Sequence, residues 1–186
     1  MKNQFFNVQK ESFLAEAIKT LILAILVVLP IRYFIFQPFF VQGSSMYPNF
    51  EDGDYLIVDE TTYKFRNPQR GEVIIFKYPK DTSQLYIKRI IGLPGESIEI
   101  QEGEIIITNS SGKYSLEEDY IPSDNKTLGN IKVNLSNDEY FVLGDNRMFS
   151  SDSRRWGTVP KENVIGRAYF RAWPFASLDI FKSPTY

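Results

Sequence analysis

The fold class is decided most clearly by one stretch of the chain, YIKRIIGLPGE at residues 86–96. Its first part, Tyr86–Ile91, is rich in β-branched and aromatic side chains, as is typical of a strand. The pair Pro94-Gly95 that follows is a strong turn signal. The stretch therefore predicts a strand that ends in a tight turn, and the same pattern recurs after residue 37.

Other short β-type runs follow the same rule, and turn signals such as Asp52-Gly53, Arg70-Gly71 and Glu102-Gly103 separate them. The runs are Tyr55–Asp59, Glu72–Phe76, Ser97–Ile100, Glu104–Thr108, Glu139–Leu143 and Val164–Arg171. Residues 99–108 are expected to form a hairpin, whereas residues 112–136 are polar, rich in turn residues and without a clear period. We expect a mostly β protein: an antiparallel β core over residues 37–95 and 138–186, with a smaller β lobe inserted at 96–137.

The N-terminal region predicts a membrane anchor. Every residue from Leu21 to Ile31 is apolar, and the apolar stretch extends over residues 13–36 if a few polar residues are tolerated near its ends. About 20 residues suffice for a helix to cross the hydrocarbon core. A cleaved signal peptide is one alternative, but no small-x-small site follows. A buried soluble helix is another, but it would need a large domain around it.

The charges before the anchor indicate its orientation. Lys2, Lys10 and Lys19 lie on its N-terminal side and favour a cytoplasmic location for residues 1–12. The β body would then lie on the extracytoplasmic face of a plasma membrane, held by a single span.

Composition excludes several kinds of site. The 186 residues include no histidine and no cysteine. A Ser–His–Asp triad, a thiol nucleophile and a zinc site built from Cys and His are therefore impossible. The net charge is only −2 and there is no basic block, which argues against nucleic-acid binding.

Three segments could carry chemistry. The first is QGSSMYP at residues 42–48, directly after the predicted anchor. Gly43 permits a sharp turn and Pro48 stiffens its exit, so the segment can present a serine hydroxyl together with backbone N–H groups. The alternative is an ordinary turn after a membrane helix.

The second segment contains Lys88. Alternation along the strand places Lys88 on one face with Tyr86 and Ile90. Burial between such neighbours would lower the pKa of the amine and make it a base near neutral pH. The alternative is a lysine on an edge strand that reaches water.

The third segment, GDNRMFSSDSRRWG at residues 144–157, is dense in Asp, Asn, Ser, Arg and Gly. Such a segment can form a fixed loop held by Asp–Arg pairs. One alternative is a solvated loop without a role. Another is a carboxylate or metal site at Asp145 and Asp152, although Arg147, Arg154 and Arg155 are positioned to neutralise those carboxylates.

Taken in order, these segments resemble the type I signal peptidases over nearly the whole chain. The most specific elements are the Lys-Arg strand that ends in Gly-Leu-Pro-Gly and the Gly-Asp-Asn-Arg loop that continues through Ser150 and Asp152-Ser153-Arg154. The resemblance implies a membrane-anchored serine endopeptidase, without metal or organic cofactor, whose partners are signal peptides of secreted precursors and the lipid bilayer.

The resemblance also implies roles for individual residues. Ser45 would be the nucleophile and Lys88 the general base, with Ser150 orienting the lysine and an Asp152–Arg154 pair supporting the loop. Gly43 stands where some members carry a second oxyanion donor. Residues expected to line the apolar wall and contact substrate are Met46, Tyr47, Tyr86 and Ile90.

Two other functions remain open from the residues alone. One is an anchored, catalytically silent β domain that binds a partner protein. The other is a hydrolase centred on Asp145 and Asp152.

Overall fold

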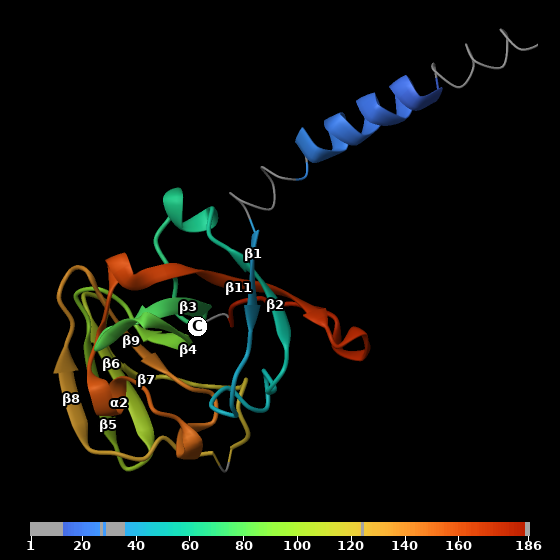
Figure 1. The fold of residues 1–186 in the computed structure, drawn as a ribbon. Coiled ribbons are helices and arrows are strands. Elements are labelled where there is room, and N and C mark those ends of the chain that lie inside the picture. The colour runs from blue at the N-terminus through green and yellow to red at the C-terminus, as the bar shows by residue number, and fades with distance from the viewer. Residues whose placement is uncertain (1–12, 27, 29–35, 124, 185–186) are drawn as a thin grey trace, which may run out of the picture. The chain divides into compact units, whose positions relative to one another are not determined.

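The computed structural model describes residues 13–26, 28, 36–123 and 125–184 (Figure 1). The chain divides into two compact units, Met1–Gln37 and Pro38–Tyr186. In the first unit a helix covers residues 13–26. No helix among the described residues is long and apolar enough to cross a membrane.

The predicted N-terminal elements fall largely outside the described residues. These include all of residues 1–12 and, within the expected span, residues 27 and 29–35. Phe36, expected to end the helix, instead begins strand β1, so that boundary is wrong. Phe36-Gln37-Pro38-Phe39-Phe40 is rich in aromatic residues, which suit an extended edge strand.

The second unit is almost entirely β, as predicted, and its strands form two sheets (Figure 1). The main sheet has the order β1-β2-β11-β3-β4-β9-β10, with β12 paired to β11, and the second sheet has the order β7-β6-β5-β8. The main-sheet strands are β1 (Phe36–Phe40), β2 (Tyr55–Asp59), β3 (Val73–Tyr78), β4 (Asp81–Gly92), β9 (Glu139–Leu143), β10 (Val159–Pro160), β11 (Val164–Trp173) and β12 (Asp179–Ile180). Those of the second sheet are β5 (Ser97–Gln101), β6 (Glu104–Asn109), β7 (Gly112–Ser115) and β8 (Ile131–Asn134). The short helices are η1 (Thr62–Lys64), η2 (Arg147–Phe149), α2 (Ser153–Trp156), η3 (Lys161–Asn163) and η4 (Phe175–Ser177).

Apolar patterning explains where the strands lie. In β5 and β6 buried and less buried residues alternate, as expected for strands with one face on a core. The runs Val73–Phe76 of β3 and Tyr140–Leu143 of β9 are buried throughout, because both strands lie inside the main sheet and are covered on both faces.

Strand β4 joins the parts of the core. Its isoleucines belong to three separate apolar clusters: Ile87 to that of Met46 and Leu56, Ile90 to that of Ile74 and Trp156, and Ile91 to that of the second sheet. The strand is paired on one side with β3, and on the other with β9 only from Arg89 onward. Lys88 therefore lies buried in the core, just before the point where β9 joins.

The second sheet lies within residues 97–134, inside the range predicted for the inserted lobe. Its β5–β6 hairpin turns at Glu102-Gly103, where both residues have positive φ, as the predicted hairpin requires. At Gly92 the lobe approaches the main sheet so closely that a Cβ would lie 2.7 Å from Leu135 Cδ1. No strand was predicted within residues 112–136, where the sequence has no clear period, but β7 and β8 lie there and form the two edges of this sheet.

Candidate active site

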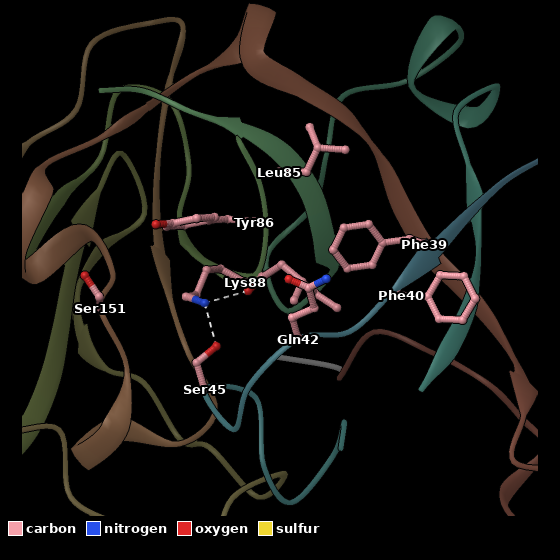
Figure 2. Close-up of a pocket in the computed structure, with 9 residues that line it drawn as sticks. Phe39, Phe40, Gln42, Ser45, Leu85, Tyr86, Lys88 and Ser151 are labelled. Carbon is pink, nitrogen blue, oxygen red and sulfur yellow. Dashed lines mark hydrogen bonds between the residues drawn. The ribbon is translucent and has the colours of Figure 1, made fainter. Parts of the chain in front are cut away.

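The hydroxyl of Ser45 and the amine of Lys88 meet in the folded chain. Lys88 Nζ lies 2.7 Å from Ser45 Oγ and donates a second hydrogen bond of 2.8 Å to the carbonyl of Ile87. Figure 2 shows the Lys88 side chain extending from β4 toward the Ser45 hydroxyl. A hydroxyl within hydrogen-bond reach of an amine is the geometry of a nucleophile and its base.

The environment of Lys88 is that of a desolvated amine. Only 4% of the residue is exposed. Tyr86 and Ile90, on the same face of β4, pack in the cluster of Ile74 and Phe76. Burial lowers the pKa of Lys88 to about 8, against the opposing effect of the Asp152 and Asp145 charges. The predicted desolvation of Lys88 is confirmed, and the alternative of a solvent-exposed lysine is wrong.

The turn that carries Ser45 is held at both ends. Gly43 has a φ of 79°, and its N–H donates to Asp52 Oδ1 at 2.6 Å. On the other side, Asn146 donates its backbone N–H to the Ser45 carbonyl at 3.1 Å and its side-chain amide to the Ser44 carbonyl at 3.0 Å. The backbone N–H of Ser45 itself has no hydrogen-bond partner among the described residues, so it is available to an oxyanion.

Ser150 lies beside this turn without bonding to Lys88. Its hydroxyl is buried and has no hydrogen-bond partner among the described residues. The space around it is tight, because a Cβ on Gly144 would lie 2.2 Å from Ser150 Oγ and 2.4 Å from the Ser45 carbonyl oxygen. Only glycine fits at position 144. The described residues show no hydrogen bond between Ser150 and Lys88, so the orienting role expected for Ser150 stays a prediction.

Two buried ion pairs hold the segment that follows β9. Asp152 accepts from Arg154 Nε and Nη2, each at 2.8 Å, and from the Gly144 N–H at 3.1 Å, so the expected Asp152–Arg154 pair is present. Asp145 is paired with Arg89 of β4, at 2.8 and 2.5 Å. The sequence predicted that an arginine of the same loop neutralises Asp145. That partner is wrong, because the arginine paired with Asp145 comes from β4, which is distant in sequence.

These pairs bear on the carboxylate alternative. Both carboxylates are bound by guanidinium groups and fully buried, so neither is positioned as an open metal ligand or as a free acid–base pair. Over the part of the chain that the structure describes, no group of three or more acidic side chains forms a candidate metal site.

A pocket of about 480 Å³ opens at the dyad (Figure 2). It is lined by Ser45 and Lys88 together with Phe39, Phe40, Gln42, Leu85, Tyr86, Ile87 and Ser151. Of the four predicted contact residues, only Tyr86 lines it. Met46 and Ile90 have no exposed surface and support the site from within the core, and Tyr47 is half exposed outside the pocket lining.

Comparisons with known proteins identify the family of this chain. The family described as "Signal peptidase, peptidase S26" matches residues 14–173. This chain belongs to that family. The family and its named members make the chain a serine peptidase, that is, a hydrolase of peptide bonds.

The similar signal peptidases span several bacterial groups. The signal peptidase I of Leptolyngbya laminosa is 39% identical over 186 residues, covering 95% of this chain and 88% of that protein. The signal peptidase I of Bacillus amyloliquefaciens is 37% identical over 168 residues, 84% of each chain. The solved signal peptidase I of Enterococcus faecalis V583 is 31% identical and covers 55% of this chain and 97% of that one, with a TM-score of 0.46.

Some contacts of this signal peptidase site were not predicted from the sequence. Asn146 was noted only as part of a polar loop, yet it binds two carbonyls of the nucleophile turn. Alternation along β4 puts Arg89 on the face opposite Lys88, but it names no partner for the guanidinium. The only sequence signal for the Arg89–Asp145 pair is the position of Asp145, an acidic residue just after a buried strand.

Proposed function

We propose that the chain removes N-terminal signal peptides from exported precursor proteins, with Ser45 as nucleophile and Lys88 as general base. The observation that carries the proposal is the 2.7 Å separation of Lys88 Nζ and Ser45 Oγ inside a buried site. The substrate class follows from the relatives, which bear the name signal peptidase I.

The chemistry begins with the neutral amine. At a pKa of about 8, roughly a tenth of Lys88 is unprotonated at pH 7. The lone pair of that amine accepts the Ser45 proton while one of its N–H groups donates to the Ile87 carbonyl, which orients the lone pair. Ser45 Oγ attacks the scissile carbonyl, and the protonated Lys88 then gives its proton to the leaving amine.

The acyl-enzyme is resolved by the same base. Neutral Lys88 takes a proton from a water molecule, the hydroxide attacks the ester carbonyl, and Ser45 Oγ recovers the proton as it leaves. In both halves the negative charge develops on the carbonyl oxygen, where the free N–H of Ser45 can donate to it.

The pocket suits the segment that precedes the scissile bond. The family resemblance implies cleavage after a small-x-small motif, and Phe39, Leu85 and Ile87 give the pocket apolar walls beside the dyad. An extended peptide in this pocket would bring its carbonyl to Ser45 and expel water from Lys88, which keeps the amine desolvated during the reaction.

Anchoring through the N-terminal segment that precedes β1 is the second part of the proposal. The substrate is itself embedded in the membrane, so a tether that ends just before Ser45 would raise the effective concentration of the nucleophile at the cleavage site. Retention in membranes after alkaline carbonate extraction supports the anchor, and release into the supernatant rejects it. Digestion of the β body by protease added to spheroplasts supports its extracytoplasmic location, and protection rejects it.

The reaction is tested with the full chain in lipid vesicles and a secreted precursor as substrate. Wild type should release the mature protein, and Ser45→Ala and Lys88→Ala should not. Activity that is lost with EDTA and restored by a divalent metal would instead support the carboxylate alternative. A folded wild-type chain that binds the precursor without cutting it would support the silent binding domain.

A further inference from the structure

Four side chains between β7 and β8 reach over to the loop that supports the nucleophile. We call Gly144–Arg147 the support loop. The four side chains, here called the clamp residues, are Glu118, Tyr120, Asn125 and Thr127. They belong to the connection between two strands of the second sheet, whereas the support loop follows β9 of the main sheet.

The strongest contact of the clamp is with Arg147. The side chain of Arg147 is fully buried, and the carboxylate of Glu118 accepts from its two terminal nitrogens at 2.5 and 2.6 Å. Thr127 Oγ1 also accepts from Arg147. The remaining nitrogen, Nε, donates to the Gly144 carbonyl at 3.0 Å. The guanidinium therefore links the clamp to the beginning of the support loop.

A second contact of the clamp is with Asp145. Asn125 donates its side-chain amide to the Asp145 carbonyl at 2.7 Å. Asn49 donates its amide to the Tyr120 carbonyl at 2.8 Å and to the Asp145 carboxylate at 2.9 Å, which joins the clamp to the chain just after the nucleophile turn. The guanidinium of Arg89, paired with Asp145, lies 4.1 Å from the centre of the Tyr120 ring.

The support loop in turn acts directly on the nucleophile turn. Asn146, between the two clamped residues Asp145 and Arg147, holds the carbonyls of Ser44 and Ser45. A displacement of the clamp would therefore be transmitted to Ser45 through a single intervening residue. Errors well below 1 Å matter here, because the Ser45–Lys88 distance must stay within hydrogen-bond reach.

The clamp contacts differ from those that stabilise the core. Apart from residue 124, which lies outside the described residues, no side chain from 117 to 130 belongs to an apolar cluster. The interaction is polar and directional, with donors and acceptors matched to the carbonyls and guanidinium of one loop. Such contacts fix the position of the support loop and bury little apolar surface.

We propose that Glu118 and Asn125 are positioning residues for peptide cleavage, which act by holding the support loop so that Asn146 keeps Ser45 aligned with Lys88. The inference rests on the proposed function, since it assigns the second sheet a part in the Ser45–Lys88 reaction. The second sheet thereby contributes to catalysis through contacts that touch neither substrate nor dyad.

The first test compares Asn125→Ala with Asn163→Ala in the full chain, using precursor cleavage in lipid vesicles. Asn163 is a matched control, because its amide also donates to a backbone carbonyl, that of Lys77, away from the site. Asn125→Ala should lower kcat about tenfold, with KM within about twofold and the melting temperature close to that of Asn163→Ala. Unchanged kcat, or a loss matched by a lower melting temperature, would overturn the proposal.

The second test uses Glu118 and a double variant. Glu118→Asp keeps the charge facing Arg147 and should recover part of the kcat that Glu118→Gln loses. Asn125→Ala combined with Asn146→Ala should lose less than the sum of the two single losses in log kcat, because both act through one loop. Additive losses, or equal defects in Glu118→Asp and Glu118→Gln, would reject the clamp. Ser45→Ala in the same assay tests the proposed function separately: activity in that variant rejects the dyad, whatever the clamp variants do.

Discussion

Lys88 and Arg89 are neighbours in the sequence, and the pleat of β4 sends their side chains to opposite faces of the sheet. Lys88 meets the hydroxyl of Ser45, whereas Arg89 binds the carboxylate of Asp145. The loop of Asp145 then returns through Asn146 to the carbonyl of Ser45. Strand β4 therefore positions the base directly and the nucleophile indirectly. Substitutions on either face of β4 should change the alignment of Ser45 and Lys88.

The choice between adjacent serines is the first prediction. Ser45→Ala should abolish precursor cleavage, because the only hydroxyl bonded to Lys88 among the described residues is lost. Ser44→Ala is the matched control, because Ser44 supports the turn through its backbone carbonyl, and alanine keeps that carbonyl. Ser44→Ala should keep activity within a few-fold of wild type. Activity lost in Ser44→Ala and kept in Ser45→Ala would show that the wrong serine was assigned.

The Asp152–Arg154 pair gives a prediction about stability and pH together. Asp152→Asn leaves the largely buried Arg154 without its counter-charge and weakens the acceptor for the Gly144 N–H. We expect a loss of about 3 kcal/mol in the free energy of unfolding, measured by urea denaturation. Because the Asp152 charge raises the pKa of Lys88, the residual activity should also show an apparent pKa below that of wild type. A shift to higher pH would contradict this electrostatic role.

Because Lys88 is buried, its charged form should lower the free energy of unfolding at neutral pH. The pKa of Lys88 is lowered from 10.5 to about 8, so between these values the unfolded chain binds one more proton than the folded chain. Stability should therefore rise with pH over that window, by about 3 kcal/mol from this group. Lys88→Met has a similar shape and no charge, and should be more stable than wild type at pH 7.

The free energies of unfolding of wild type and Lys88→Met, measured at pH 7 and near pH 10.5, separate the contribution of the Lys88 charge from that of its shape. The advantage of Lys88→Met should shrink as the pH rises through the window, because neutral Lys88 no longer opposes folding. Lys132→Met is a suitable control, since Lys132 lies exposed on the edge strand β8. An advantage of Lys88→Met that is constant with pH would mean that the lysine is not desolvated in the folded chain.

Periodicity in the sequence was sufficient to predict the core strands but not the edges of the second sheet. Tyr86, Lys88 and Ile90 share a face in the alternating pattern, and the folded strand keeps them on that face. Strands β7 and β8 were missed because β7 is exposed throughout and β8 has no fully buried residue. The sequence of β7 carries no apolar period, and the alternation of Ile131 and Val133 in β8 is too short to predict a strand, so pairing with β6 and β5 defines both.

The dyad could be predicted because family motifs name its residues, whereas the polar contacts around it depend on tertiary structure. Asp145 has three arginines close by in sequence, yet its partner is Arg89 on a separate strand. Likewise, Arg147 binds Glu118 of the inserted lobe, which no local pattern links to it. Partner choice among charged residues depends on which backbones the sheets bring together.

The most direct test of the account is the pH dependence of cleavage for wild type and Lys88→Arg. Wild type should show kcat/KM rising with pH through an apparent pKa near 8, because the buried amine must lose its proton to act as the base. Lys88→Arg should be as inactive as Lys88→Ala at every pH up to 10, because the guanidinium stays protonated. Near-normal turnover by Lys88→Arg, or a wild-type profile that rises only near pH 10.5, would contradict the assignment of Lys88 as the general base.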